Sequence, residues 1–349
     1  MKSPVSEYHA LEARILPALR ANLDEAKFGA LALAAHDFQK RWNAPYAKFC
    51  AKRPAATHWR EIPAVPQSVF KSARLSALPP AAVTRTFHTS GTTTETPGKH
   101  HFADTRLYDA AVLAGWDALV GRSTHAAILL VPEDQDAPHS SLSHMLRLLA
   151  RERADDLVFP VVNAKGALDI GRFTDAVETC YAMRQPVALL GTALAFVHLH
   201  GRLDGAGGRL RSGSFALETG GYKGTGREVP KAELYARIGG MFALAEKDII
   251  NEYGMTELSS QFYTRGLGGV HAGPPWLRAL VIDPETGGEV AVGDTGVLRI
   301  FDLANLGSVL AVETQDLAVR RERGFELLGR DPAAIPRGCS RTADAGLRG

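Results

Sequence analysis

Between residues 125 and 254, short apolar runs alternate with segments whose apolar residues recur at helical spacing. The apolar runs are HAAILLVP, DLVFPVV, PVALLGT, SGSFALETGG and DIINEYG. The predicted helices between them are LSHMLRLLARER, DIGRFTDAVETCYAMRQ, ALAFVHLHGRL and residues 231–244. This alternation predicts an α/β fold with a parallel sheet covered on both faces. Ligands of such sheets bind beyond the carboxyl ends of the strands, which directs attention to VPEDQDAPHSS, LLGT, LETGGYKG and NEYGMTE.

The flanking regions have other patterns. Apolar residues at helical spacing predict helices from residue 7 to about residue 40, whereas the prolines of 59–73, WREIPAVPQSVFKSA, argue against a regular element there. After Gly273, RALVID, GGEVAV and GVLRIFDL read as short antiparallel strands, and LAVRRERGFELLGR as a hairpin turning at residues 323–324. We therefore predict an α/β core over 1–272, an antiparallel β subdomain over 273–330 and a short C-terminal remnant over 331–349.

Composition excludes several classes of partner. The 349 residues include 40 basic and 38 acidic side chains, so the formal charge of +2 gives no long-range field for nucleic acid or a membrane surface. No segment reaches the ~18 consecutive apolar residues that a membrane span needs, and the N-terminus lacks the apolar core of a signal peptide. We expect a cytoplasmic protein. Its three cysteines, Cys50, Cys180 and Cys339, are odd in number and widely spaced, which disfavours a disulfide framework or a zinc site.

The stretch FHTSGTTTETPGKHHF, residues 87–102, concentrates hydroxyl side chains and glycines around one lysine, Lys99. Hydroxyls and exposed N–H groups in a glycine-rich turn form a concave set of donors, and phosphate is the anion that suits them. A solvated surface loop is the alternative interpretation. A Walker A loop is excluded, because six residues separate Gly91 from Gly98 and His100 follows the lysine.

A second unusual segment is NEYGMTELSSQFY, residues 251–263. Glu257 follows a predicted strand, beside Thr256, and is a suitable oxygen ligand for Mg²⁺, which usually takes one or two carboxylates together with substrate phosphates. The alternative is a helix-capping Thr–Glu pair.

Taken together, TSGTT followed by a lysine and a distant YGMTE resemble the adenylate-forming enzymes, which include acyl-CoA ligases, amino-acid-adenylating domains and luciferases. Within this superfamily the chain is most similar to the acyl-protein synthetase (LuxE) branch, with phenylacetate-CoA ligases as relatives. The resemblance runs from IPAVPQSVFK through TSGTT, PGKHHF, SSLSHM, ETGGYKG and YGMTE to LGRD and RGCS. It implies the large N-terminal domain of these enzymes, with parallel sheets, an antiparallel subdomain and a truncated C-terminal lid domain.

The resemblance also implies a reaction. A carboxylic acid, which the LuxE likeness implies is a fatty acid, attacks the α-phosphate of ATP to give an acyl-adenylate and pyrophosphate, and a nucleophile then takes the acyl group. ATP and Mg²⁺ are the implied cofactors. The residues implied to hold the β- and γ-phosphates are Thr89, Ser90, Gly91, Thr92 and Thr93, with Lys99 assisting. The chain departs from the widespread pattern at Thr94, where most members have glycine, and has instead the PGRH-like element of the acyl-protein branch.

Other nucleotide contacts are implied motif by motif. ETGGYKG matches the adenine-binding turn and supplies Glu218, Gly220, Gly221 and Tyr222, whose ring would stack on the base; an ordinary strand–helix turn is the alternative. Tyr253 and Gly254 would flank the nucleotide, Thr256 would reach the α-phosphate and Glu257 would hold Mg²⁺. Asp316 of VETQDLA and Arg330 of LGRD would bind the ribose hydroxyls. The alternative is that both are ordinary surface charges.

The acid and the acyl acceptor have candidate residues as well. In PHSSLSHM, Ser140, Ser141 and His144 would line the acyl pocket, and His144 would orient the carboxylate unless its role is structural.

The resemblance implies that a mobile C-terminal lid domain delivers a catalytic lysine in full-length adenylate-forming ligases. The nineteen residues after Arg330 contain no lysine. Arg337 and Arg341 flank Cys339 in RGCSR, and neighbouring cations stabilise a thiolate. In the acyl-protein synthetases a cysteine in a matching element accepts the acyl group as a thioester and passes it to a partner reductase. An incidental tail cysteine is the alternative for Cys339, whereas Cys50 and Cys180 read as structural.

Three other functions remain open from the sequence. A CoA ligase would form acyl-CoA directly, and a stand-alone adenylating enzyme of a natural-product pathway would stop at the adenylate. A non-catalytic nucleotide-binding scaffold belongs to a different class; the missing lysine favours it and the intact YGMTE opposes it. The implied partners are the acid and an acyl-accepting reductase or carrier protein.

Overall fold

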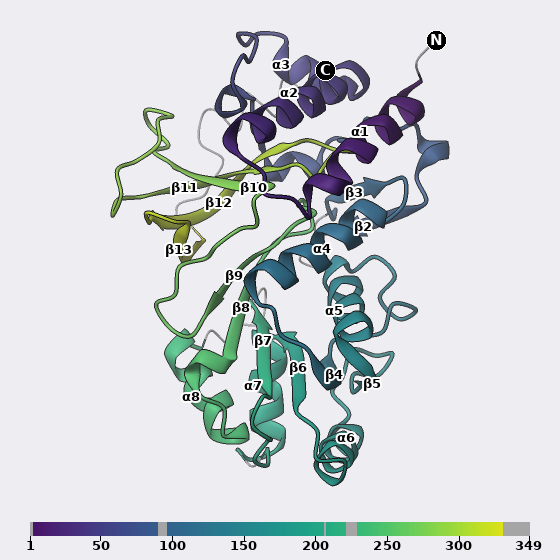
Figure 1. The fold of residues 1–349 in the computed structure, drawn as a ribbon, viewed down its shortest axis with the longest axis vertical. Helices are drawn as coiled ribbons and strands as arrows, with labels where there is room; N and C mark the ends of the chain where they lie inside the picture. The colour runs from purple at the N-terminus through teal and green to yellow at the C-terminus, as the bar shows by residue number, and fades with distance from the viewer. Residues whose placement is uncertain (1–2, 90–95, 206, 221–228, 331–349) are drawn as a thin grey trace. The chain divides into compact units, whose positions relative to one another are not determined.

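The computed structural model describes residues 3–89, 96–205, 207–220 and 229–330. The chain forms two compact units (Figure 1). The first unit comprises Met1–Gly115, Met255–Gln261 and Val270–Gly349, and the second comprises Trp116–Gly254 and Phe262–Gly269. The chain therefore leaves the second unit inside the YGMTE motif, directly after Gly254. The division of the chain at residues 272 and 330 stays a prediction.

The second unit is built on a six-stranded sheet with the order β5-β4-β6-β7-β8-β9. Its first five strands are parallel, and β9 is antiparallel to β8. Five of these strands are the apolar runs of the sequence, so the predicted parallel sheet is confirmed. The strands are β4 (Thr124–Leu130), β5 (Ala154–Pro160), β6 (Val187–Thr192), β7 (Phe215–Thr219), β8 (Ile249–Tyr253) and β9 (Phe262–Arg265).

Helices cover both faces of this sheet, as predicted. Successive side chains of a strand point to opposite faces. Leu189 of β6 packs in a core with α6 (Ile170–Ala182), α7 (Ala193–Arg202) and α8 (Lys231–Phe242), whereas its neighbour Leu190 faces α5 (Ser141–Arg153). Each fully buried aliphatic or aromatic side chain of this kind contributes about 1.5–3 kcal/mol of apolar transfer free energy.

The first unit contains a five-stranded sheet with the path β1-β12-β11-β10 and with β13 paired to β12. Every pairing is antiparallel except that of β1 with β12. A separate hairpin joins β2 to β3. The strands are β1 (Val65–Pro66), β2 (Arg85–His88), β3 (Lys99–Phe102), β10 (Leu277–Ile282), β11 (Thr295–Asp302), β12 (Ala311–Arg320) and β13 (Phe325–Arg330).

The helices predicted near the N-terminus are present. They are α1 (Pro4–Ala18), α2 (Glu25–Trp42) and α3 (Ala44–Cys50). The 3₁₀ turns are η1 (Trp59–Glu61), η2 (Gln67–Lys71), η3 (Pro80–Ala82) and η4 (Glu246–Asp248). Helix α4 (Arg106–Leu119) was not predicted, and it spans the boundary between the units at residue 115.

Two expectations of the sequence need correction. The proline-rich 59–73 region is not wholly irregular: it holds η1, η2 and the two-residue strand β1, whose Val65 pairs with Val312. GGEVAV is not a strand, because its backbone makes a tight turn after β10 and only one bridge, between Glu289 and Ile282. The β12–β13 hairpin is confirmed, and its turn contains Gly324 at a φ of 96°.

Among the helices in the described part of the chain, none has the length and apolar character that crossing a bilayer requires.

Replacement of Gly324 by alanine tests the packing of the β12–β13 turn. A Cβ at this position would lie 2.0 Å from the carbonyl oxygen of His271, whose backbone pairs with Phe325. Gly293 has a similar φ of 97°, but a Cβ added there would have no heavy atom within 4 Å. We expect Gly324→Ala to lower the free energy of unfolding by about 2–4 kcal/mol and Gly293→Ala by about 1 kcal/mol. Denaturant titrations of both variants measure this, and equal losses would contradict the steric argument.

Candidate functional site

Strands β2 and β3 of the first unit, which flank the hydroxyl-rich stretch in the sequence, pair as an antiparallel hairpin (Figure 1). Just beyond the strands, the N–H of Thr89 donates to the carbonyl of Gly98 at 2.9 Å, and the N–H of Gly98 donates to the Thr89 hydroxyl at 2.8 Å. A Cβ on Gly98 would lie 3.2 Å from the backbone of Phe70, so glycine allows this close approach without displacing a neighbour. The base of the turn is thus closed tightly. Ser90, Gly91, Thr92 and Thr93 lie outside the described residues.

Both strands of the hairpin contact Thr256 of YGMTE. Nδ1 of His100, on β3, donates to the carbonyl oxygen of Thr256 at 2.7 Å. The Thr256 hydroxyl in turn lies 3.4 Å from the carbonyl oxygen of His88, the last residue of β2, and donates to it. The β2–β3 hairpin and Thr256, which are distant in sequence, are therefore joined within the first unit.

Burial holds His100 in the neutral state. Its ring packs against Phe70 and Phe102, with centroids 5.9 and 4.2 Å away, and is almost completely buried. Burial lowers the pKa of His100 to about 4, although the bond to Thr256 opposes this shift. At neutral pH the imidazole therefore carries one proton, and the bond to a carbonyl fixes that proton on Nδ1.

Lys99 lies on the opposite face of β3 from His100 and is exposed. It is paired across the hairpin with His88 in the strand register. The predicted phosphate lysine thus stands at the first position after the turn, on the solvent side of the hairpin.

Glu257 follows Thr256 and is 8% exposed. Its backbone carbonyl accepts a hydrogen bond of 2.7 Å from Nδ2 of Asn305. Within the described residues, no group of three His, Cys, Asp or Glu side chains is arranged to hold a metal ion. A single carboxylate nonetheless fits Mg²⁺ in its common role, in which substrate phosphates and water complete the coordination.

The two residues predicted to bind ribose are neighbours in the first unit. Asp316 and Arg330 pair across β12 and β13, and the Arg330 Nε lies 3.9 Å from the Asp316 Oδ1. The Asp316 side chain is 15% exposed and the Arg330 side chain 55%. Gly329, on β13, has a φ of 105° beside an irregularity in the strand register, where Leu317 pairs with Gly329 and Ala318 with Leu327.

In the second unit, the predicted adenine turn begins where β7 ends. Glu218 is buried within the sheet, where its Oε1 accepts hydrogen bonds from Tyr235 at 3.0 Å and Asn251 at 2.7 Å. Burial raises the pKa of Glu218, and Lys231 partly offsets this. Gly220 is exposed, and a Cβ added to it would have no heavy atom within 4 Å. Gly221 and Tyr222 lie outside the described residues.

Tyr253 and Gly254 occupy the carboxyl end of β8. Tyr253 is the last residue of that strand and is 8% exposed, with its ring centroid 6.2 Å from that of Phe262 on β9. Gly254 follows it and is partly exposed. These positions agree with the expectation that polar and glycine-containing motifs follow the carboxyl ends of parallel strands.

The PHSSLSHM segment forms the start of α5 in the second unit. The Ser140 hydroxyl caps this helix by accepting from the N–H of Ser143 at 3.0 Å, and Ser141 is its first residue. His144 lies in the first turn, where its Nδ1 is 3.8 Å from a carboxylate oxygen of Asp134 in the loop after β4. The three predicted residues are thus gathered at one helix end.

The cysteines of the described chain fit the structural role predicted for them. Cys50 and Cys180 are free thiols and are buried. Burial raises the pKa of both thiols, which keeps them protonated and unreactive. Cys339 lies outside the described residues.

Sequence reasoning missed three buried polar residues around YGMTE. His100, Asp302 and Asn305 all contact residues 256–260. The PGKHHF motif was the only sequence signal for His100. Asp302 ends the apolar strand β11 and Asn305 follows it in DLANLGS, a pattern that a surface turn also produces.

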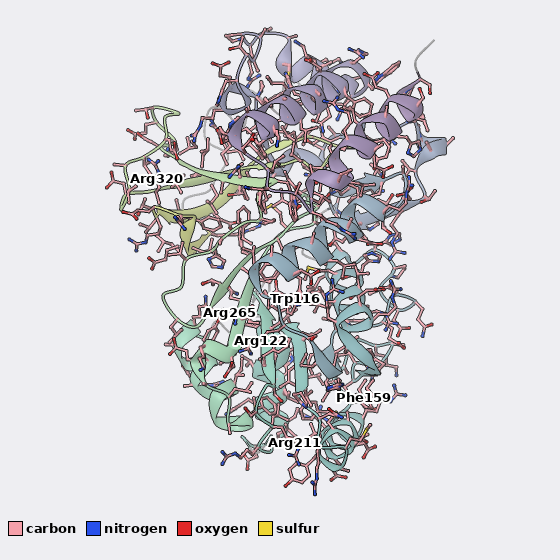
Figure 2. All side chains as sticks on the ribbon, in the orientation of Figure 1. Trp116, Arg122, Phe159, Arg211, Arg265 and Arg320 are labelled. Atoms are coloured by element: carbon pink, nitrogen blue, oxygen red, sulfur yellow. The ribbon has the colours of Figure 1, made fainter. Side chains whose placement is uncertain are left out.

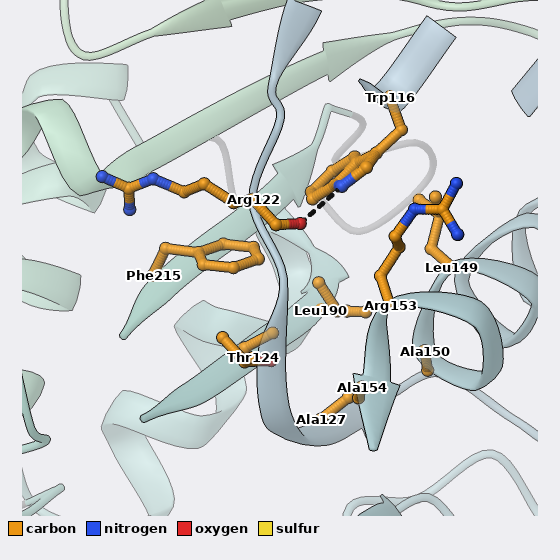
Figure 3. Close-up of a pocket in the computed structure, with 11 residues that line it drawn as sticks. Trp116, Arg122, Thr124, Ala127, Leu149, Ala150, Arg153, Ala154, Leu190 and Phe215 are labelled. Carbon is orange, nitrogen blue, oxygen red and sulfur yellow. Dashed lines mark hydrogen bonds between the residues drawn. The ribbon is translucent and has the colours of Figure 1, made fainter. Parts of the chain in front are cut away.

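The cavity in Figure 3 lies at the other end of the second unit's sheet. It has a volume of about 10 Å³, room for about one water molecule, and a mostly apolar lining. Trp116 lies beside it and donates to the carbonyl of Arg122 at 2.7 Å (Figures 2 and 3). Thr124, Ala154 and Phe215 of the lining are the first residues of their strands. The cavity is therefore a packing defect, away from the motif-bearing strand ends.

Comparison with known proteins identifies the fold. No family model matches the chain, and no curated protein matches it. Among solved structures, an open conformation of 2-hydroxyisobutyryl-CoA ligase in complex with 2-HIB-AMP and CoA has a TM-score of 0.64 at 15% identity, covering 91% of this chain and 79% of that chain. The chain thus has the fold of adenylate-forming ligases.

Two further structures agree. McyG A-PCP complexed with phenylalanyl-adenylate has a TM-score of 0.51 at 17% identity, over 73% of this chain. ATP-bound MatB from Rhodopseudomonas palustris has a TM-score of 0.51 at 16% identity, over 71% of this chain. This chain covers 48% of each of these two proteins.

Replacement of Glu252 by glutamine tests the electrostatics of β8. Glu252 is buried, and burial raises its pKa from 4.5 to about 7 despite a hydrogen bond with Thr219. The folded state thus keeps a proton that the unfolded state loses, so the stability contributed by this group is full below pH 4.5 and is lost as the pH rises through 7. We expect the free energy of unfolding of the wild-type protein to fall by on the order of 3 kcal/mol as the pH rises through 7. This fall should be absent in Glu252→Gln, which has no carboxyl group to titrate.

The measurement is the free energy of unfolding from about pH 5 to about pH 8.5, a range that spans the raised pKa of Glu252. Glu233→Gln is the control, because Glu233 on α8 is exposed and paired with Arg237. A Glu252→Gln profile that keeps the wild-type slope would contradict a buried, protonated carboxyl group.

Proposed function

We propose that the chain is an ATP- and Mg²⁺-dependent adenylate-forming ligase of the acyl-protein synthetase (LuxE) type, acting in the cytoplasm on a carboxylic acid of the fatty acid class. The observation that carries this proposal is the pair of hydrogen bonds between the β2–β3 hairpin and Thr256. Because they join the hydroxyl-rich turn to YGMTE, a triphosphate held by the turn would have Thr256 and Glu257 beside it.

In the first step the carboxylate of the acid attacks the α-phosphorus of ATP, and the bond to pyrophosphate breaks. Thr89, Ser90, Gly91, Thr92 and Thr93 would donate hydrogen bonds to the β- and γ-phosphates, and Lys99 would add a positive charge. Lys99 is exposed at the first position of β3. Thr256 would contact the α-phosphate.

Glu257 would hold Mg²⁺, which neutralises charge on the phosphate oxygens as the leaving group departs. The carboxylate stands directly after Thr256, whose carbonyl and hydroxyl are both hydrogen-bonded to the hairpin. The residue directly before the metal-binding position is therefore held in place before the nucleotide binds.

The rest of the nucleotide would be bound by the residues named from the motifs. Asp316 would accept hydrogen bonds from the ribose hydroxyls, and its neighbour Arg330 would assist. The adenine turn would supply Gly220, Gly221 and Tyr222, with Tyr253 and Gly254 flanking the nucleotide. Glu218 supports that turn from within, since its carboxylate is bonded to Tyr235 and Asn251.

The acid would bind at the start of α5. Ser140 and Ser141 would line its pocket, and His144 would orient the carboxylate. Nδ1 of His144 lies 3.8 Å from a carboxylate oxygen of Asp134, which helps to orient the imidazole ring.

In the second step the thiolate of Cys339 would attack the acyl carbonyl, forming a thioester while AMP leaves with the bonding electrons. A partner reductase or carrier protein would then accept the acyl group on a thiol. A CoA ligase is the second candidate, because the similar 2-hydroxyisobutyryl-CoA ligase was solved with CoA.

Replacement of Glu257 by glutamine tests the first step. The change keeps the size of the side chain and removes the negative charge, so we expect pyrophosphate release with ATP, Mg²⁺ and a responsive acid to fall at least about 100-fold. Glu313→Gln is the control: Glu313 is paired with Arg299 on the first unit's sheet, and its loss should leave the rate unchanged. Full activity of Glu257→Gln would show that the metal assignment is wrong.

Replacement of Cys339 by alanine tests the second step. With ATP, Mg²⁺ and a panel of radiolabelled acids, we expect the wild-type protein to acquire label that survives denaturation and is released by neutral hydroxylamine. Cys339→Ala should lose the label and keep pyrophosphate release, whereas Cys180→Ala should keep both, because Cys180 is a buried thiol. Unlabelled protein together with released acyl-CoA, when CoA is supplied, would instead support the CoA ligase.

A further inference from the structure

A buried turn of the first unit, residues 302–305, contacts the segment that carries Glu257. Nδ2 of Asn305 donates to the carbonyl oxygen of Glu257 at 2.7 Å, and its Oδ1 accepts from the Ser259 hydroxyl at 2.6 Å. Asp302 accepts from the N–H of Ser259 at 2.8 Å and from the Ser260 hydroxyl at 2.8 Å. One short turn thus binds three of the four residues from Glu257 to Ser260.

The Asp302 carboxylate is completely buried, and both of its oxygens accept hydrogen bonds. Besides the two serines, the N–H of Ala304 donates to Oδ1 at 2.9 Å. The Ser260 hydroxyl also accepts from the Trp276 indole at 3.0 Å, which directs its proton toward Asp302. Asparagine has the same shape, but its NH₂ group would face at least one of these donors.

The turn is itself anchored to helix α2. Nε2 of Gln39 donates to the carbonyls of Asn305 at 2.9 Å and Leu306 at 3.1 Å, and its Oε1 accepts from the N–H of Leu310 at 2.8 Å. Gln39 is completely buried and uses both ends of its amide. The turn is therefore a fixed support, because moving it would leave buried polar groups unpaired.

The contacts to YGMTE follow one another along the backbone. The hairpin holds Thr256, Asn305 holds the carbonyl of Glu257, and Asp302 holds the N–H of Ser259. Backbone atoms fixed on both sides of a residue set the direction of its Cα–Cβ bond. The direction in which the Glu257 carboxylate leaves the chain is accordingly determined by side chains that belong to other segments.

We propose that Asp302 and Asn305 are positioning residues, which orient the Glu257 carboxylate toward Mg²⁺ and the phosphates of ATP. This inference rests on the proposed function, because it gives Glu257 the metal-binding role. Replacing a residue that orients a metal ligand by hydrogen bonding typically lowers metal affinity by about 10–100-fold. A merely structural role would lower stability and leave metal affinity in the folded protein unchanged.

The test compares Asn305→Ala and Asp302→Asn with the wild-type chain. Binding of Mn²⁺ in the presence of ATP is measured by the electron paramagnetic resonance of free Mn²⁺, and hydrogen exchange is measured for the amides of 255–261. We expect both variants to weaken Mn²⁺ binding about 10-fold or more and to exchange the Ser259 amide faster. In pyrophosphate exchange, kcat should fall while the KM for the acid stays within about twofold.

Ser308→Ala is the matched control. The Ser308 hydroxyl is buried and donates to the carbonyl of Leu75 at 2.9 Å, so its loss removes a buried hydrogen bond from the same loop without touching 257–260. We expect it to leave Mn²⁺ affinity within about twofold of wild type. All three variants are compared at a temperature where melting curves show each to be folded.

The outcomes separate the two proposals. A wild-type chain that binds no Mn²⁺–ATP and exchanges no pyrophosphate with any acid would overturn the proposed function and, with it, this inference. An active wild-type chain with Asn305→Ala and Asp302→Asn of unchanged Mn²⁺ affinity would overturn the positioning role alone. Equal weakening in Ser308→Ala would also overturn it, because the effect would then follow from any loss of a buried bond in this loop.

Discussion

The hydrogen bond from His100 to the carbonyl of Thr256 is the interaction on which the candidate site depends. It joins a hairpin to a motif 156 residues away in the sequence. A buried main-chain carbonyl needs a donor, and the imidazole Nδ1–H supplies it, while the apolar surroundings of the ring keep His100 neutral. Leaving the Thr256 carbonyl without this donor would cost about 1–3 kcal/mol. The same bond keeps the base of the hydroxyl-rich turn beside Glu257.

The two units are stabilised in different ways. The core between the second unit's sheet and helices α6 to α8 is largely apolar, so its stability comes from the area removed from water. The first unit also buries a polar network, in which Gln39, Asp302 and Asn305 find partners for the atoms described above. Such networks add little net stability but allow few alternative arrangements, because each displaced group loses its partner. Loops that must present side chains at fixed positions benefit from this property.

The elements of the second unit were predictable because each is a local pattern. Strands β4 to β8 are runs of apolar residues, and the helices between them repeat at helical spacing. The β2–β3 hairpin was missed because RTFH and KHHF are polar and rich in histidine, and only pairing across the strands makes them a hairpin. GGEVAV has the alternation of a strand, yet it makes a single bridge with β10 and no ladder. Alternation shows that a segment suits a pleated surface and does not show that a partner strand is available.

The sequence by itself determined the alternating strands and helices of the second unit, its parallel sheet and the motifs that follow the strands, because apolar periodicity and glycine-rich turns are encoded within a few residues. Only the tertiary structure decided that His100 contacts Thr256 and that Asp302 and Asn305 hold the segment of Glu257. The partners Asn305 and Glu257 are 48 residues apart, and no local pattern records such a distance. Burial then fixed the chemistry of these side chains: the same histidine or aspartate at the surface would be hydrated, whereas here each must find a partner inside the protein.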